Sequence, residues 1–161
     1  MFDLKKELYL KIILILSFIA LIFAYFVEYI LGHQPCNLCI IERIPYGISI
    51  ILIAIIFIIK KNQKFLTLLL ILTFAFSFII SFYHYGIEQG FFDESTVCNA
   101  RNFTESITKE DLLKELSKKT ISCKDVTFRF FGFSLTSINV VLSLLFIITL
   151  IKIFIKYEKN K

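Results

Sequence analysis

Four long apolar runs alternate with short polar segments along this 161-residue chain. The runs cover about residues 12–31, 44–59, 65–82 and 135–155. A helix needs about 20 mainly apolar residues to cross a bilayer, and a slightly shorter run can span where the bilayer thins or flanking lysines snorkel. The pattern therefore predicts an all-α membrane protein, a four-transmembrane-helix bundle that forms one membrane domain over residues 1–161.

Composition supports this class. Hydrophobic residues make up 57% of the chain and charged residues only 19%, with a mean hydropathy of +0.77. These values lie far outside the usage of soluble domains. The net charge of +5 comes from lysines beside the apolar runs, so nothing indicates a nucleic-acid partner.

Lysines collect in three of the polar segments, and they predict the orientation of the spans. Cytoplasmic loops and tails carry an excess of Lys and Arg. The N-terminal tail, the second connection and the C-terminal tail hold Lys5, Lys6, Lys11, Lys60, Lys61, Lys64, Lys152, Lys156, Lys159 and Lys161. We therefore expect both termini in the cytoplasm, and the connections at about residues 32–43 and 83–134 on the outer side.

The four cysteines all fall in these two outer connections. Outside the cytoplasm paired thiols are oxidised, so disulfide chemistry is expected. Cys36 and Cys39 form a C-x-x-C, a spacing that in redox proteins lowers a thiol pKa and allows exchange between disulfide and dithiol. Pro35 disfavours continuation of the first helix, so we expect Cys39 at or just before the N-terminus of the second, where the helix dipole favours a thiolate.

Arg43 follows Cys39 by four residues, which places it one helical turn further along the same face. A cation there could stabilise a thiolate or polarise the carbonyl of a bound quinone, and the alternative is a topology anchor that snorkels to the headgroups. We expect Glu42 to be a solvated partner of Arg43. Glu28, near the outer end of the first span, is given no role.

The second pair, Cys98 and Cys123, encloses a polar stretch with one helix signal. Thr108-Lys-Glu-Asp111 has the form of a capping box, and leucines follow it on one face. The pattern predicts a short amphipathic helix over residues 108–119. Taken alone, the pair is either a structural disulfide that closes the loop or a partner in exchange with the C-x-x-C.

The string Pro35-Cys-Asn-Leu-Cys-Ile-Ile-Glu-Arg43, the two cysteine segments and the four-span layout resemble the DsbB family of bacterial thiol oxidases. The likeness covers nearly the whole chain, and the motif at the start of the second span is specific. It implies a multi-pass protein of the bacterial cytoplasmic (inner) membrane. Such proteins reoxidise a DsbA-like periplasmic thioredoxin-fold oxidase and pass the electrons to a membrane quinone, ubiquinone or menaquinone.

The resemblance also implies a role for each cysteine. Cys98 is attacked by the thiolate of the partner, which frees Cys123, and Cys123 then attacks Cys36. Cys39 is released as a thiolate that donates to the quinone, with Arg43 supporting the quinone oxygen. The partner is strongly oxidising, at about −120 mV for DsbA, so only an acceptor of higher potential such as a quinone can drain it.

Two further features of the outer connections give weaker indications of function. The resemblance aligns His84 roughly with a histidine near the quinone, but an interfacial histidine between Tyr83 and Tyr85 is also typical of an aromatic belt. The phenylalanines before the fourth run indicate another belt: Phe128, Phe130, Phe131 and Phe133.

Four other interpretations stay open on the sequence. The chain could be an oxidoreductase dedicated to one substrate protein, or a branch related to the vitamin K epoxide reductase family, whose loop cysteines precede the C-x-x-C. It could instead be a non-enzymatic protein that binds zinc or copper(I) through all four cysteines. A structural protein with two passive disulfides is the fourth. We expect no resident metal.

Overall fold

The computed structural model describes residues 2–59, 62–94, 98, 122–124, 128–130 and 132–159. Its elements, in chain order, are helices α1 (Phe2–Tyr29), α2 (Asn37–Ile41), α3 (Ile44–Ile58) and α4 (Gln63–Glu88), strands β1 (Arg129–Phe130) and β2 (Phe133–Ser134), and helix α6 (Leu135–Lys159). Four helical segments are long and apolar enough to cross a membrane, with α2 and α3 together forming the second. The predicted four-helix membrane bundle is confirmed.

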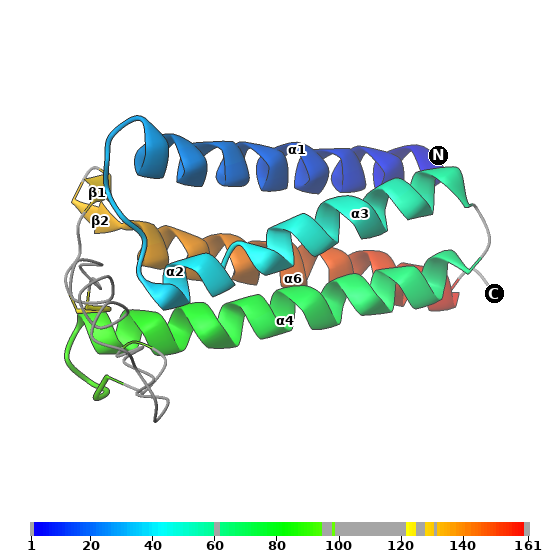
Figure 1. Ribbon diagram of the computed structural model, residues 1–161. Helices are drawn as coiled ribbons and strands as arrows, with labels where there is room; N and C mark the ends of the chain where they lie inside the picture. The colour runs from blue at the N-terminus through cyan, green and yellow to red at the C-terminus, as the bar shows by residue number, and fades with distance from the viewer. Residues whose placement is uncertain are drawn as a thin grey trace, which may run out of the picture.

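The helices run side by side as an up-and-down bundle (Figure 1). Helix α4 packs along α6, and α3 packs against both α1 and α4. Both termini lie at one end, together with the end of α3 and the start of α4 (Figure 1). The link from α1 to α2, the end of α4 and the two strands lie at the opposite end. The lysine-rich segments thus share one end of the bundle, and the C-x-x-C lies at the other.

The interior combines aromatic packing with small polar contacts between helices. Phe74 of α4 meets Phe146 of α6 edge to face, with ring centroids 4.8 Å apart. Buried hydroxyl groups form hydrogen bonds between helices. Ser49 of α3, for example, donates to Ser17 of α1 over 3.2 Å. Small hydroxyl residues allow close helix approach where lipid gives no hydrophobic drive to associate. Large apolar side chains such as Ile15 and Ile79 point outward, as a lipid-facing surface requires.

Two helix boundaries differ from the prediction, and both differences shape the site. Helix α4 continues to Glu88 instead of ending near residue 82, because nothing breaks the helix before Gly90, which has a left-handed φ of +78°. The second span is divided at Glu42 and Arg43. Helix α3 restarts there with Pro45 in its first turn, where a missing N–H costs nothing.

The segment before α6 forms a small hairpin. Arg129 pairs with Ser134 and Phe130 with Phe133, and Gly132 supplies the positive φ of +86° in the turn. The sequence predicts only an aromatic belt here, and the exposed Phe133 side chain fits that reading. The amphipathic helix predicted over residues 108–119 lies outside the described residues.

Candidate functional site

Cys36 and Cys39 form a disulfide at the start of the second span, with Cα atoms 5.1 Å apart. Cys36 is the N-cap of α2, and its sulfur accepts a hydrogen bond from the backbone N–H of Cys39 over 3.2 Å. Cys39 was expected at or just before the N-terminus of this helix, and it is the third residue of α2. Cys36 caps the helix, and Cys39 lies within its first turn, because Pro35 ends the extended link just before the cap.

Cys98 and Cys123 form the second disulfide, with Cα atoms 5.6 Å apart. Both are buried, in the same apolar cluster as Cys36, Leu38 and Ile87. The two cysteine pairs, far apart in sequence, thus pack into one cluster. This arrangement suits exchange between the pairs better than an isolated loop closure does.

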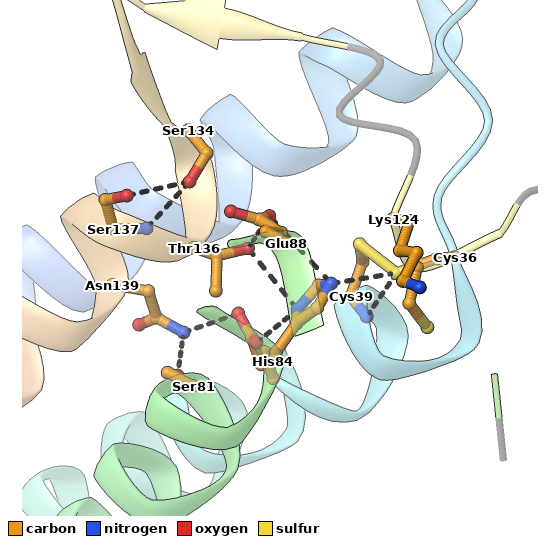
Figure 2. Close-up of polar contacts among 12 residues, drawn as sticks. Cys36, Cys39, Ser81, His84, Glu88, Lys124, Ser134, Thr136, Ser137 and Asn139 are labelled. Atoms are coloured by element: carbon orange, nitrogen blue, oxygen red, sulfur yellow. Dashed lines mark hydrogen bonds and ion pairs between the residues drawn. A yellow bond between two sulfur atoms is a disulfide. The ribbon is translucent and has the colours of Figure 1, made fainter. Parts of the chain in front are cut away.

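His84 lies against the C-x-x-C. Its Nε2 is 3.5 Å from the Cys36 sulfur, and its Nδ1 is 2.7 Å from Oε1 of Glu42 (Figure 2). The side chain is 98% buried, so the aromatic-belt interpretation of His84 is wrong. The extension of α4 past residue 82 explains this position, because it turns His84 toward the bundle interior.

Glu42 is buried, and it is held from two sides. Its Oε1 contacts His84, and its Oε2 accepts a hydrogen bond of 2.8 Å from Nδ2 of Asn139. Asn139 also donates to Ser81 over 2.7 Å and accepts from the Tyr46 hydroxyl. The expectation of a solvated Glu42 paired with Arg43 is wrong, because neighbouring helical positions point in different directions and Glu42 faces α4 and α6.

Glu88 adds a second carboxylate beside His84. Its Oε1 accepts a hydrogen bond of 2.7 Å from Thr136 and lies 4.0 Å from Nε2 of His84. The Thr136 hydroxyl is also 3.3 Å from Nδ1 of His84 (Figure 2). The other oxygen, Oε2, is buried and has no hydrogen-bond partner among the described residues. Such an orphaned acceptor is rare in proteins and marks a place where a ligand or proton would bind.

Arg43 points the other way, toward α1. It forms an ion pair with Glu28, approaches the Ala24 carbonyl at 3.5 Å, and lies over the Tyr25 ring at 5.0 Å from its centroid. Glu28 thus has a structural role that the sequence did not supply. Both charged groups are mostly buried, so the pair avoids the cost of an unpaired charge at the membrane boundary.

A cavity of about 390 Å³ opens between these groups. Its size falls in the range of ligand pockets, roughly 300–1,000 Å³. One wall carries Cys36, Cys39, Arg43 and His84, and apolar side chains of α1 and α6 make up much of the remainder. Cys123 also lines it. Most of the residues singled out in the sequence therefore meet at one cavity, and Cys98 lies in the adjoining cluster.

Two of three comparisons with known proteins found matches to this chain. A family model described as "Disulfide bond formation protein DsbB" matches residues 6–153. The uncharacterized protein RP370 of Rickettsia prowazekii (strain Madrid E) is 32% identical over 162 residues, which cover 98% of this chain and 94% of that protein. No solved structure gives a significant match.

Proposed function

The chain belongs to the DsbB family of disulfide bond formation proteins, a family of membrane thiol-disulfide oxidoreductases, and from this premise we propose that it reoxidises a DsbA-like partner and passes the electrons to a membrane quinone. One observation carries the proposal. Both disulfides pack into a single buried cluster beside a cavity that also holds Arg43 and His84. Passive disulfides have no need of such a cavity.

The electron path begins at the loop pair. A thiolate of the reduced partner attacks Cys98, and the Cys98–Cys123 bond breaks to give a mixed disulfide and a free Cys123 thiolate. The second partner thiol then closes the disulfide of the partner and leaves Cys98 reduced. The partner loses two electrons and two protons, and the loop pair gains them. This order of attack is supported by the family motif and by the position of Cys123 at the cavity.

The second exchange moves the electrons to the C-x-x-C. The Cys123 thiolate attacks the Cys36 sulfur and releases Cys39 as a thiolate into the cavity. The Cys98 thiolate then attacks Cys123, which restores the Cys98–Cys123 disulfide and leaves Cys36 reduced. The C-x-x-C now holds both electrons, and it returns to the Cys36–Cys39 disulfide when it passes them on. His84 holds Nε2 at 3.5 Å from the sulfur under attack, while Glu42 accepts from Nδ1. Glu42 therefore fixes the imidazole ring, and Nε2 faces the sulfur that is attacked.

The cavity fits the head of a quinone. Apolar walls suit the faces of a planar ring, and the Arg43 guanidinium and the His84 ring supply polar groups for its oxygens. A quinone bound there would accept the two electrons and two protons that the partner loses. Arg43 is held by Glu28 and Tyr25, so its position does not depend on the ligand.

The proposed setting is the bacterial inner membrane, with both termini in the cytoplasm and the cysteine segments in the periplasm. Its support is the excess of lysine in the tails and in the link between α3 and α4. The two disulfides agree with this orientation, because disulfides persist on the oxidising side of that membrane.

The test is turnover with a purified protein in detergent. A reduced thioredoxin-like periplasmic oxidase is supplied as substrate, and its reoxidation is followed with and without added ubiquinone or menaquinone. We expect quinone-dependent turnover in the wild type and none in Cys39→Ser. Thr149→Ala serves as the control, because Thr149 is away from the cavity and its hydroxyl donates to the Leu145 carbonyl of its own helix.

Three outcomes would count against the proposal. Turnover that ignores quinone would leave a thiol oxidoreductase with another acceptor. Turnover with one substrate protein and no general partner would favour the dedicated oxidoreductase. The absence of turnover with every partner and quinone, in a protein that elutes with bound metal, would favour the metal-binding alternative.

A further inference from the structure

Three potential metal ligands converge beside the cavity. The sulfurs of Cys36 and Cys39 and a ring nitrogen of His84 all lie within 4.8 Å of one another. Thiolates 2.3 Å and imidazole nitrogens about 2.0 Å from a tetrahedral zinc ion lie roughly 3.5–3.8 Å apart. The 3.5 Å between Cys36 Sγ and His84 Nε2 already meets this spacing. C-x-x-C is also the usual spacing of two cysteines that chelate one zinc ion.

The histidine is oriented as metal-bound histidines are. In most protein metal sites the histidine nitrogen that does not bind the metal donates its proton to a carboxylate, a backbone carbonyl or water, which fixes the ring and raises its basicity. Here the Nδ1 of His84 lies 2.7 Å from Oε1 of Glu42, and Asn139 holds the other oxygen of Glu42. Nε2 is therefore the nitrogen directed at the sulfurs (Figure 2).

A further oxygen stands beside the same nitrogen. Glu88 follows His84 by one helical turn, and its Oε1 is 4.0 Å from Nε2. The side chain of Glu88 is 94% buried, and its Oε2 has no hydrogen-bond partner within the part of the chain that the structure describes. An unpartnered buried carboxylate oxygen next to two sulfurs and an imidazole is independent support for a cation site.

We propose that the reduced form of the C-x-x-C binds one Zn²⁺ through Cys36, Cys39 and His84, and that this ion blocks reoxidation of the pair. Reduction of the disulfide takes up two electrons and two protons, both from a dithiol reductant that becomes a disulfide, or the electrons from a phosphine that becomes its oxide and the protons from water. Zinc then displaces the two thiol protons and forms two Zn–S bonds. The two thiolates balance the charge of a divalent ion, which suits a site buried at the membrane boundary. A metal-bound sulfur is no longer free to donate electrons.

This site differs from a four-cysteine metal centre, because the loop pair takes no part in it. It also needs only reduction of the C-x-x-C, and neither the quinone nor the DsbA-like partner. The zinc titration of reduced protein therefore tests the metal site, and the turnover assay independently tests the oxidase activity. Loss of zinc binding would leave the proposed oxidase activity standing, and absence of turnover would leave the titration unchanged.

The titration uses the full chain in detergent with Cys98→Ser and Cys123→Ser, so that the loop pair cannot bind metal. The protein is reduced, freed of reductant without oxygen, and titrated with Zn²⁺ against a chromophoric chelator. We expect one zinc per chain in the reduced form and none in the oxidised form. Co²⁺ in place of Zn²⁺ should give a thiolate-to-cobalt charge-transfer band that Cys39→Ser abolishes.

Substitutions of His84 and Glu42 distinguish a three-ligand zinc site from zinc binding by the two cysteines alone. Glu42→Gln should weaken zinc affinity by about 10- to 100-fold, as loss of a carboxylate behind a ligating histidine does. His84→Gln should weaken it more. His33→Gln is the matched control, because His33 is the other histidine of the chain and also lines the cavity, but it packs against Phe128 and is not one of the three converging ligands.

The zinc effect on turnover completes the test. Zn²⁺ should slow quinone-dependent reoxidation by the wild type, and a chelator should restore it. Equal zinc affinity in His84→Gln and His33→Gln, or binding by the oxidised form as tight as by the reduced form, would overturn the proposal.

Discussion

Asn139→Ala should destabilise the bundle, because one side chain connects three others inside it. Asn139 of α6 donates to Glu42 and to Ser81 of α4, and accepts from Tyr46 of α3. Side-chain hydrogen bonds between membrane helices average about 0.6 kcal/mol each, so three amount to about 2 kcal/mol. That loss corresponds to about a 30-fold change in the unfolding equilibrium.

The assay is equilibrium unfolding in mixed micelles of rising dodecyl sulfate fraction, followed by far-ultraviolet circular dichroism. Thr149→Ala removes a hydroxyl from the same helix, but one that bonds only its own backbone, so its effect should stay within about 0.5 kcal/mol. If Asn139→Ala costs no more than Thr149→Ala, the buried network contributes nothing to stability and the reasoning fails.

Three other predictions concern exchange, the cavity and a close packing contact. Cys123→Ser should abolish turnover in the partner reoxidation assay, because Cys98 then has no disulfide bond for the partner thiolate to attack. Arg43→Lys keeps the charge but loses the planar fork, so the KM for quinone should rise about tenfold while the protein stays folded. Gly86→Ala would place a Cβ within the ring of Phe92 and should displace that ring, lowering stability by about 1 kcal/mol in the same unfolding assay.

The spans and their order could be predicted because membrane length and lysine placement are properties of single segments. Their ends could not. The third apolar run ends near residue 82, and the tyrosines around His84 are typical of a membrane interface. Helix α4 runs on to Glu88 because the chain meets no conformational break before Gly90. An interface marks where lipid ends, and it does not terminate a helix.

The cysteines and Arg43 could be identified from a motif, whereas the network behind them could not. Glu42 and Arg43 are neighbours in sequence, which suggested an ion pair between them. Adjacent residues on a helix do not face each other, and here the chain also breaks between α2 and α3. The only sequence signal for Asn139 was a polar residue inside an apolar run, which marks an internal contact without naming its partner.

The neighbouring positions of Glu42 and Arg43 account for how two charged residues serve one site. A buried charge near lipid is tolerated only when it is paired. Glu42 and Arg43 both have right-handed helical dihedrals, and neighbouring positions on a helix point about 100° apart. Glu42 therefore reaches His84 on one side, and Arg43 reaches Glu28 on the other. His84 and Arg43 are each held by a carboxylate and both line the cavity, so two neighbouring residues of one short motif help to position two basic side chains of the same site.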